Sequence, residues 1–358
     1  MKIAQIAPLY ESVPPKLYGG TERVVSYLTE ELVRLGHKVT LFASGDSITT
    51  ARLESGCAKA LRLTRCADPL AHHVVLLDKV LAKASEFDVL HFHTDYQHFP
   101  ATRNLQLPAV TTLHGRLDLP DLVPLYQQFD RLPLVSISQS QRRPLGRVNW
   151  VGNVHHGLPI NLYRRQPKPG EYLAFLGRIS PEKRPDRAIH IAKKAGMKLK
   201  IAAKVDAVDR QYFESTIKPL LDNPNVEFLG EINEQEKNEF LGKAYAYLFP
   251  IDWPEPFGVS MIEAMACGTP TVAFCRGSVP EVIDDGVTGF IVGNEEEAVK
   301  ALERVSRLSR ARCRATFERR FTACRMAKEY LSIYEALAGE GRQPQTVSSI
   351  ELSSTVLS

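Results

Sequence analysis

The chain has 358 residues, which is too long for one ordinary core and predicts two domains. Apolar residues make up 44% and charged residues 24%, a composition typical of a soluble globular protein. The formal net charge of +4 is too small to argue for nucleic acid as a partner, although it suits polyphosphates or an anionic membrane surface.

The start of the chain lacks the pattern of a signal peptide, and no apolar stretch approaches the roughly 20 residues that span a bilayer. We therefore expect a cytoplasmic protein. Its six cysteines have spacings that match no zinc site, and they are expected to be free thiols.

The first half of the chain alternates short apolar runs with helical periodicity. Thr21 is placed to cap a helix whose apolar residues recur at helical spacing up to Gly36. Strands are predicted over 2–7, 37–43, 88–93, 109–115 and 134–138. This alternation indicates a parallel sheet covered by helices on both faces.

A segment with three prolines and no apolar period, 158–170, predicts a linker, after which the same alternation begins again. Strands are predicted over 172–177, 199–203, 226–230, 246–250 and 271–274. We therefore expect one α/β domain over 1–160, a second over 168–320, and a disordered tail over 341–358. Two such domains in tandem place a cleft between them, where ligands meet the carboxyl ends of the strands.

The first candidate site lies directly after the predicted strand 172–177. Arg178 and Lys183 belong to the run GRISPEKR, which opens a helix at the carboxyl end of the sheet. An arginine gives phosphate oxygens a two-pronged contact and a lysine adds a point charge, so a diphosphate would fit here. The alternative is a solvated helix start that carries chance cations.

The second candidate site is the segment 255–270, in which a helix begins near Gly258 soon after a strand ends. Helix starts favour anions, and glycine has no side chain to block a phosphate. Glu263 is spaced to accept hydrogen bonds from two ribose hydroxyls, and Glu255 precedes the helix and can reach a sugar. The alternative for either glutamate is an exposed helix charge. The amides at this helix start belong to Phe257, Gly258 and Val259.

These segments together resemble family 4 of the glycosyltransferases. The resemblance rests on GRISPEKR, FGVSMIEAMACGTP, GSVPEVIDDGVTGFIV and the early run YGGTERVVSYLTEELVRLGHKVTLFASGD, and it covers residues 1 to about 335. It implies a GT-B fold, in which two Rossmann-like domains face a central cleft and a last helix, about 323–338, crosses back to the first domain. It also implies a retaining transfer of a hexose from a nucleotide-diphosphate sugar, expected to be a UDP-sugar, to an unknown acceptor hydroxyl.

The resemblance also assigns roles to residues. His114 and Glu255 would contact the donor sugar, Arg178 and Lys183 the diphosphate, and Glu263 the ribose. The other expected donor contacts are Gly19, Gly20, Lys204, Leu229, Phe257, Gly258 and Val259. A glycine pair between strand and helix lets backbone approach the diphosphate, although it also suits a simple tight turn.

Two positions depart from the family pattern. Many relatives have Asp after the histidine, whereas this chain has Gly115, which removes a carboxylate partner for His114. Many relatives also have a glycine-rich turn where this chain reads AAKVD, and Lys204 in it adds a cation beside the diphosphate or covers the nucleotide pocket.

No cofactor and no metal are expected. The chain has no Asp-x-Asp run, and the histidines near one strand end, His91, His93 and His98, form no known metal pattern. Neither domain's first strand is followed by G-x-G-x-x-G, which argues against a dehydrogenase. A sugar-nucleotide epimerase, a sugar phosphorylase and a non-catalytic sugar-nucleotide-binding protein stay open as alternatives.

The acceptor is not identified by the sequence. Asp95 is expected to face it, since acceptor pockets lie on loops of the first domain. Arg142, Arg143 and Arg147 are predicted to share a helix that is either solvated or a peripheral contact with the inner face of a membrane.

Overall fold

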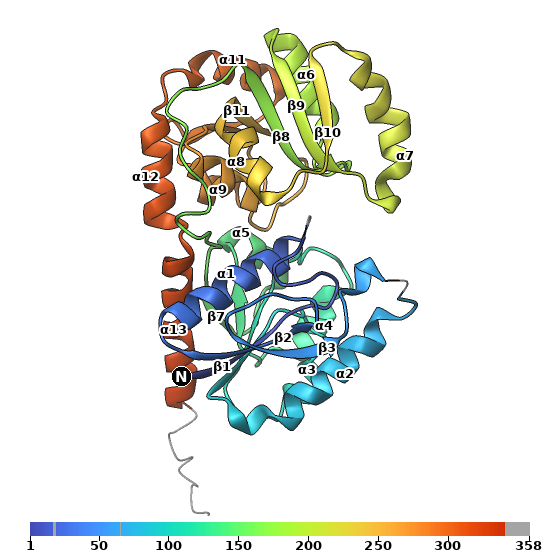
Figure 1. Cartoon of the computed structure of the whole chain (residues 1–358), viewed down its shortest axis with the longest axis vertical. Coiled ribbons are helices and arrows are strands. Elements are labelled where there is room, and N and C mark those ends of the chain that lie inside the picture. The colour runs from blue at the N-terminus through green and yellow to red at the C-terminus, as the bar shows by residue number, and fades with distance from the viewer. Residues whose placement is uncertain (17–18, 65, 341–358) are drawn as a thin grey trace, which may run out of the picture.

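The computed structural model describes residues 1–16, 19–64 and 66–340, which form two α/β domains stacked along the long axis (Figure 1). The first domain holds a seven-stranded parallel sheet in the order β3-β2-β1-β4-β5-β6-β7. Its strands are β1 Lys2–Ile6, β2 Lys38–Ser44, β3 Arg52–Cys57, β4 Val89–Phe92, β5 Ala109–Thr112, β6 Leu134–Ser136 and β7 Trp150–Asn153. The two edge strands, β3 and β7, were not predicted because their sequences carry little of the apolar pattern that marks a buried strand.

The second domain holds a six-stranded parallel sheet in the order β10-β9-β8-β11-β12-β13. Its strands are β8 Tyr172–Arg178, β9 Lys198–Lys204, β10 Val226–Gly230, β11 Ala244–Phe249, β12 Thr271–Phe274 and β13 Gly289–Val292. The register of β8 and β9 pairs Arg178 with Lys204 at their carboxyl ends. Two predicted cations therefore lie side by side at the edge that faces the first domain.

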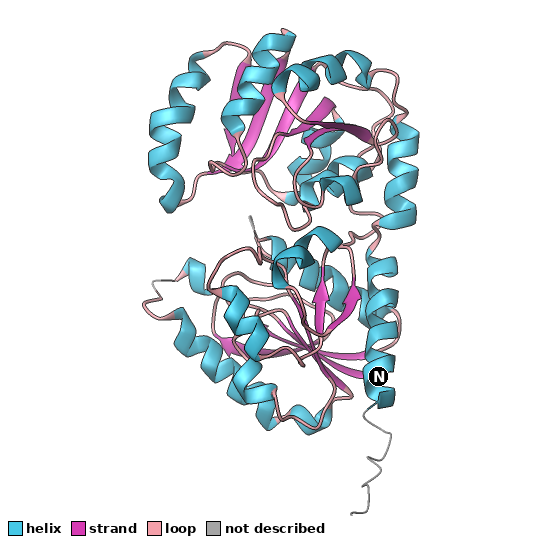
Figure 2. Cartoon of the chain, turned by 180° about the vertical axis from the view of Figure 1, so that it is seen from behind, coloured by secondary structure: helices cyan, strands magenta, loops and turns pink. Residues whose placement is uncertain are grey.

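Helices cover both faces of each sheet, as Figure 2 shows from behind. In the first domain they are α1 Gly20–Arg34, α2 Pro69–Ala82, α3 Phe99–Thr102, α4 Leu122–Gln128 and α5 Gln139–Arg142. In the second they are α6 Pro185–Ala195, α7 Arg210–Tyr212, α8 Glu234–Gly242, α9 Val259–Ala266, α10 Val279–Val282, α11 Glu295–Val305 and α12 Arg310–Arg320, and α13 Ala323–Glu340 follows. The Thr21 cap was predicted wrongly: α1 begins at Gly20, and its N-cap, Gly19, has no side chain to accept a hydrogen bond.

Helix α13 leaves the second domain and packs on the first. Its buried residues Met326, Tyr330 and Tyr334 join the core that α1 and the first sheet build with Leu28 and Val110. Figure 1 shows this helix, in red, running beside the lower domain. Among the described residues, none of the helices combines the length and the apolar character needed to cross a membrane. The tail predicted over 341–358 lies outside the described residues.

The two places where the chain passes between domains lie side by side. The amide of Leu158 donates to Phe321 O at 2.9 Å, and the amide of Ala323 donates to Leu158 O at 2.8 Å. Backbone approaches so closely here that a Cβ at Gly157 would stand 2.3 Å from Thr322 O, which only glycine avoids.

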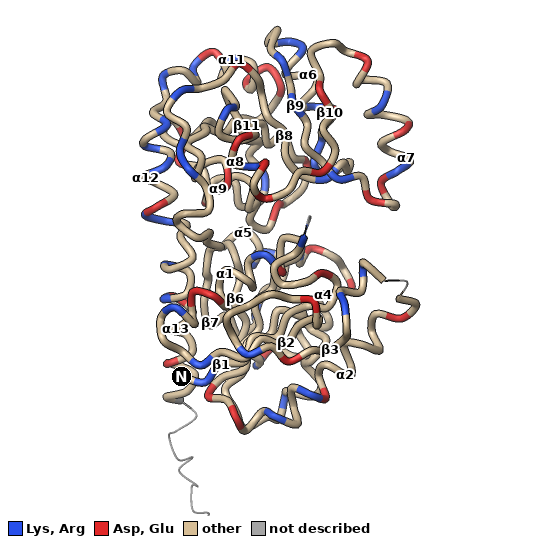
Figure 3. Tube along the Cα trace, in the orientation of Figure 1, with Lys and Arg blue, Asp and Glu red and all other residues tan. Residues whose placement is uncertain are grey.

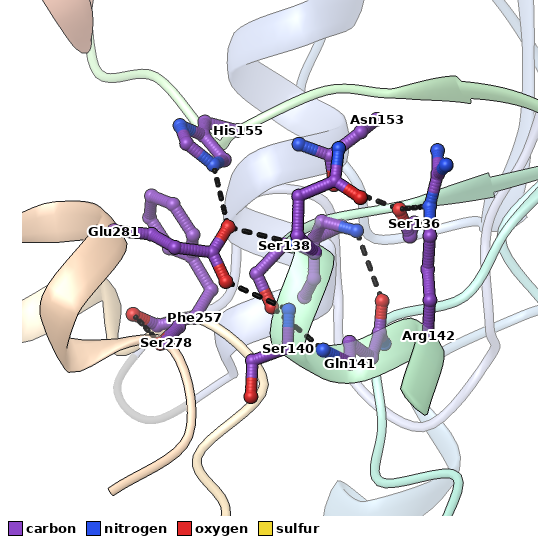
Figure 4. Close-up of polar contacts among 12 residues, drawn as sticks. Ser136, Ser138, Ser140, Gln141, Arg142, Asn153, His155, Phe257, Ser278 and Glu281 are labelled. Carbon is purple, nitrogen blue, oxygen red and sulfur yellow. Dashed lines mark hydrogen bonds and ion pairs between the residues drawn. The ribbon is translucent and has the colours of Figure 1, made fainter. Parts of the chain in front are cut away.

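A carboxylate of the second domain binds the start of α5 in the first (Figure 4). Glu281 accepts hydrogen bonds from the amides of Gln139 and Ser140, each at 2.7 Å, and His155 Nε2 lies 3.4 Å from it. Burial raises the pKa of Glu281, but these hydrogen bonds outweigh burial and hold the pKa below 4.5. An ionised Glu281 therefore joins the two domains.

The predicted arginine helix is shorter than expected. It ends as α5 at Arg142, a tight turn spans Arg143–Leu145, and Gly146 at φ 57° turns the chain before Arg147. Arg142 is half-buried and donates to Ser136 Oγ and to the carbonyl of Gly152, so it contacts the protein rather than a surface partner (Figure 4).

Candidate active site

A cleft of about 530 Å³ lies between the carboxyl ends of the two sheets, and both domains contribute to its lining. It gathers eleven of the twelve residues predicted to form the site. These are Gly19, Gly20, His114, Arg178, Lys183, Lys204, Glu255, Phe257, Gly258, Val259 and Glu263. Segments more than two hundred residues apart in the sequence thus meet in one cavity.

Leu229 is the exception, since it is not among the residues that line this cleft. It is the second-last residue of β10, it is 39% exposed, and Gly230 then ends the strand and turns the chain at φ 71°. The two residues after the turn, Glu231 and Ile232, reach the cleft instead. Leu229 thus lies just before the part of this loop that lines the cleft, which begins beyond the turn at Gly230.

Lys183 and Glu255 form an ion pair inside the cleft. Lys183 lies in the turn between β8 and α6, and Glu255 in the loop between β11 and α9. The indole of Trp253 donates to the same carboxylate oxygen at 3.0 Å, and the Lys183 ammonium stands 4.9 Å from the centre of the Trp253 ring. The three side chains fix one another, so a cation and a carboxylate are held side by side.

Arg178 is surrounded by carboxylates. Its guanidinium lies 3.2 Å from Glu182, 3.8 Å from Asp206 and 3.6 Å from Asp209. Asp206 also holds Lys204, at 2.9 Å. Figure 3 shows the wider pattern, in which basic and acidic positions are interspersed along both domains.

Such pairing has a chemical consequence. A cation that already pairs with a carboxylate attracts a second anion less strongly. A ligand phosphate would therefore have to form hydrogen bonds to these cations alongside their carboxylate partners.

The start of α9 offers backbone amides to the cleft. Gly258, its N-cap, has φ 80°, which favours glycine, and a Cβ there would stand 2.6 Å from Met261 Cε. Five residues on, Glu263 is only 3% exposed and accepts from Lys237 Nζ at 3.0 Å and Tyr163 Oη at 3.2 Å. A helix start and a fixed carboxylate thus lie within one turn and a half of helix.

The two adjacent glycines of the first domain, Gly19 and Gly20, have different surroundings. A Cβ at Gly19 would meet Pro15 Cβ at 2.8 Å, whereas nothing lies within 4 Å of a Cβ built at Gly20. Gly19 therefore serves the packing of the loop before α1, and Gly20 leaves open space in the wall of the cleft.

His114, at the end of β5, contacts two other histidines. Its Nε2 lies 2.9 Å from Nδ1 of His93, its ring stacks on His156 at 5.3 Å, and its Nδ1 has no protein partner. Burial lowers the pKa of His114 to about 3, so the ring is neutral at physiological pH. It can give or accept a hydrogen bond, but it is not a charged acid.

The other predicted polar residues of the first domain have distinct environments. Asp95 lines the cleft with a left-handed backbone, at φ 51°, and an exposed side chain. His98 is buried behind it and contacts Thr111 Oγ1 at 2.9 Å. Within 1–16, 19–64 and 66–340, no three or more His, Cys, Asp or Glu side chains are grouped so that they could hold a metal ion. All six cysteines are free thiols, as predicted.

Sequence reasoning missed several residues of the cleft, among them His156, Lys237 and Trp253. One signal was available: the pair His155-His156 follows the last strand of the first sheet, the same end at which His114 was found. Lys237 carried no such signal, because it faces Glu263 only through the packing of α8 against α9.

Two family models match the chain, one for each domain. The model described as Glycosyltransferase Family 4 matches residues 18–152, and the model described as Glycosyl transferases group 1 matches residues 158–319.

Relatives of known sequence agree with these matches. An uncharacterized glycosyltransferase of Methanocaldococcus jannaschii is 26% identical over 343 residues, covering 82% of this chain and 85% of the relative. A phosphatidyl-myo-inositol mannosyltransferase of Propionibacterium freudenreichii is 40% identical over 83 residues, which is 22% of each chain.

Solved structures share the fold at low identity. AviGT4, a glycosyltransferase involved in avilamycin A biosynthesis, has a TM-score of 0.74 at 22% identity, covering 94% of this chain and 98% of its own. The HepE protein of Anabaena has a TM-score of 0.73 at 20% identity, covering 94% of this chain and all of its own. The fold is therefore GT-B, as predicted, and the chain belongs to the family 4, group 1 glycosyltransferases.

Proposed function

We propose that the protein is a retaining, metal-independent hexosyltransferase whose donor is a UDP-sugar. One observation carries the proposal: a single cleft combines the start of α9, the two glutamates that flank it and the cations Arg178 and Lys183. Each of these groups suits one part of a nucleotide-diphosphate sugar.

The donor would lie across the start of α9. The amides of Gly258 and Val259 and the positive end of the helix suit a phosphate, and Glu263 suits the ribose hydroxyls. Glu255 would contact hydroxyls of the sugar, with Lys183 beside it to bind the diphosphate. Gly20 leaves room for the reacting part of the donor on the opposite wall.

Departure of the diphosphate would be assisted by charge. Arg178, Lys183, Lys204 and the helix amides would stabilise the negative charge that develops on the leaving oxygen, which is the role a metal ion has in other transferases. Their carboxylate partners keep these side chains in place before the donor arrives.

Retention would follow from attack on the face that the diphosphate leaves. Glu255, the carboxylate assigned to the sugar, is engaged by Lys183 and Trp253, which makes it a poor nucleophile for a covalent route. The departing phosphate oxygen would instead accept the proton of the acceptor hydroxyl, and neutral His114 would hold the sugar by a hydrogen bond.

The relatives support the donor class. Structures of the Anabaena HepE protein are in complex with UDP and with UDP-glucose, and D-inositol 3-phosphate glycosyltransferases of Mycobacterium tuberculosis are 29% identical over 163 residues. One further neighbour, a starch synthase of Arabidopsis thaliana, is bound to ADP, so a donor screen includes ADP-sugars beside UDP-sugars.

The test is a hydrolysis screen of UDP-, GDP- and ADP-sugars, followed by an acceptor screen with proton NMR of the product anomer. We expect UDP-sugars to be cleaved and the donor configuration to be kept. An inverted product would overturn retention. Phosphate-dependent release of a sugar 1-phosphate would indicate a phosphorylase, and an epimerised sugar formed without acceptor would indicate an epimerase.

A further inference from the structure

A chain of hydrogen bonds runs beneath His114 through three adjacent strands. His114 follows β5, His93 follows β4, and Gln5 lies on β1, next to β4. His114 Nε2 lies 2.9 Å from His93 Nδ1, and His93 Nε2 lies 2.8 Å from Gln5 Oε1. Gln5 and His93 are 0% and 2% exposed, so water does not compete for these contacts.

The amide oxygen of Gln5, at the end of this row of hydrogen bonds, determines which group donates in each of them. An amide oxygen only accepts, so Gln5 Oε1 requires a proton on His93 Nε2. Burial lowers the pKa of His93 well below 6.5, and a neutral imidazole carries one proton. Its Nδ1 is then an acceptor, which requires the proton of His114 to sit on Nε2.

The crossover helix accommodates this orientation of the Gln5 amide. Gln5 Nε2 donates to Tyr334 Oη at 3.1 Å, and Tyr334 Oη lies 2.7 Å from His91 Nδ1. His91 Nε2 in turn lies 2.7 Å from Thr112 Oγ1, which meets Tyr330 Oη at 2.9 Å. Every member of this group has a partner when Gln5 turns its oxygen toward His93.

A reversed arrangement, with Gln5 flipped, would put the proton of His114 on Nδ1. That nitrogen is buried and has no protein partner, so the flip would leave a buried N–H without an acceptor. Orphaned buried N–H groups are rarer than unfilled acceptors.

We propose that His93, held by Gln5, is a positioning residue that fixes His114 as the Nε2–H tautomer, so that Nδ1 accepts a hydrogen bond from a hydroxyl of the donor sugar. This role for Nδ1 rests on the proposed function. The tautomer itself depends only on the hydrogen bonds of the ligand-free protein.

The tautomer is read directly by two-bond proton–nitrogen NMR on the full chain labelled with ¹⁵N-histidine, with the His114 signals assigned from His114→Asn. We expect Nε2 to be protonated and Nδ1 to be bare in both His114 and His93. A proton on Nδ1 of His114 would overturn the proposal.

A matched pair of variants tests the consequence. In His93→Gln the amide oxygen can still accept from His114 while the amide N–H donates to Gln5, whereas His93→Leu fills a similar space without either contact. We expect His93→Leu to lower kcat for sugar transfer by about tenfold, the loss of one hydrogen bond, and to leave the affinity for UDP within about twofold. His93→Gln should retain kcat within about threefold of the wild type.

Equal kcat in all three proteins would refute the positioning role, and so would an equal loss in both variants. If His93→Leu does not fold, the His114 tautomer in His93→Gln decides, since the proposal requires the Nε2–H form to persist there. A wild-type protein that neither binds UDP nor transfers sugar would refute the proposed function, while the NMR measurement would still report on the tautomer.

Discussion

Replacing Glu263 with glutamine tests the donor site with the smallest change of shape. Among the described residues, both protein contacts of this carboxylate go to Oε1, from Lys237 and Tyr163, which leaves Oε2 for a ligand. In Glu263→Gln the amide oxygen will keep the position that accepts from these two groups. The amide nitrogen then replaces Oε2, and a nitrogen that carries two protons cannot accept from ribose hydroxyls.

The expected magnitude follows from what is lost. A hydrogen bond to a charged group contributes about 1.5–3 kcal/mol, and each 1.4 kcal/mol is roughly a factor of ten in affinity. Glu263→Gln should therefore weaken UDP binding by about 10- to 150-fold in isothermal titration calorimetry. Some stability should be lost as well, because Lys237 is left beside a neutral group.

Asp186 provides a matched control. It is also a buried carboxylate that contacts a cation and a tyrosine, Arg184 at 2.8 Å and Tyr212 at 2.8 Å, but it does not line the cleft. Asp186→Asn should lower the melting temperature to a similar degree while UDP affinity stays within about twofold. Unchanged UDP affinity in Glu263→Gln, or an equal loss in Asp186→Asn, would remove Glu263 from the donor site.

Three further outcomes are expected. Arg178→Ala and Lys183→Ala should each lower kcat about tenfold or more. The double variant should lose less than the product of the two single losses, because both side chains act on one diphosphate. Near-wild-type kcat in both single variants would refute their role. Transfer should persist in excess EDTA, and complete loss that manganese or magnesium restores would refute metal independence. Burial lowers the pKa of His98 from 6.5 to about 3, so below pH 6.5 the unfolded state binds a proton that the folded state excludes, and stability falls as pH drops. His98→Gln should flatten that fall by up to about 1.4 kcal/mol per pH unit in denaturant titrations between pH 6.5 and 4, and an unchanged slope would contradict the reasoning.

The sequence predicted the sheets well where strands are buried on both faces. Apolar runs such as that of β1 and β8 can only be central strands, and the second half repeats the pattern of the first. The edge strands β3, β7 and β13 were not predicted. The sequences of β3 and β7 carry little apolar pattern, whereas the apolar run of β13 is only four residues long. The N-cap of α1 was misjudged because the helix begins at Gly20, after a glycine that has no side chain to signal a cap.

The candidate site was predictable where backbone and charge determine it. Arg178 ends β8, Lys183 lies in the turn that follows, and Gly258 lies between β11 and α9, so chain order places all three at the carboxyl edge of the sheet. Partners across the structure were not predictable. Lys183 meets Glu255, and His114 meets His93, through tertiary contacts between elements whose relative positions no local pattern encodes.

The paired crossings at Leu158 and Thr322 have a mechanical consequence. Two backbone segments, tied by hydrogen bonds of 2.9 and 2.8 Å, are held together at one side of the interface, where they can bend but not slide past each other. We expect such a double connection to act as a hinge, about which the domains would open at the opposite side of the cleft. The donor would then enter and the products leave through the same opening. A side chain added at Gly157 would clash with the Thr322 backbone at the hinge.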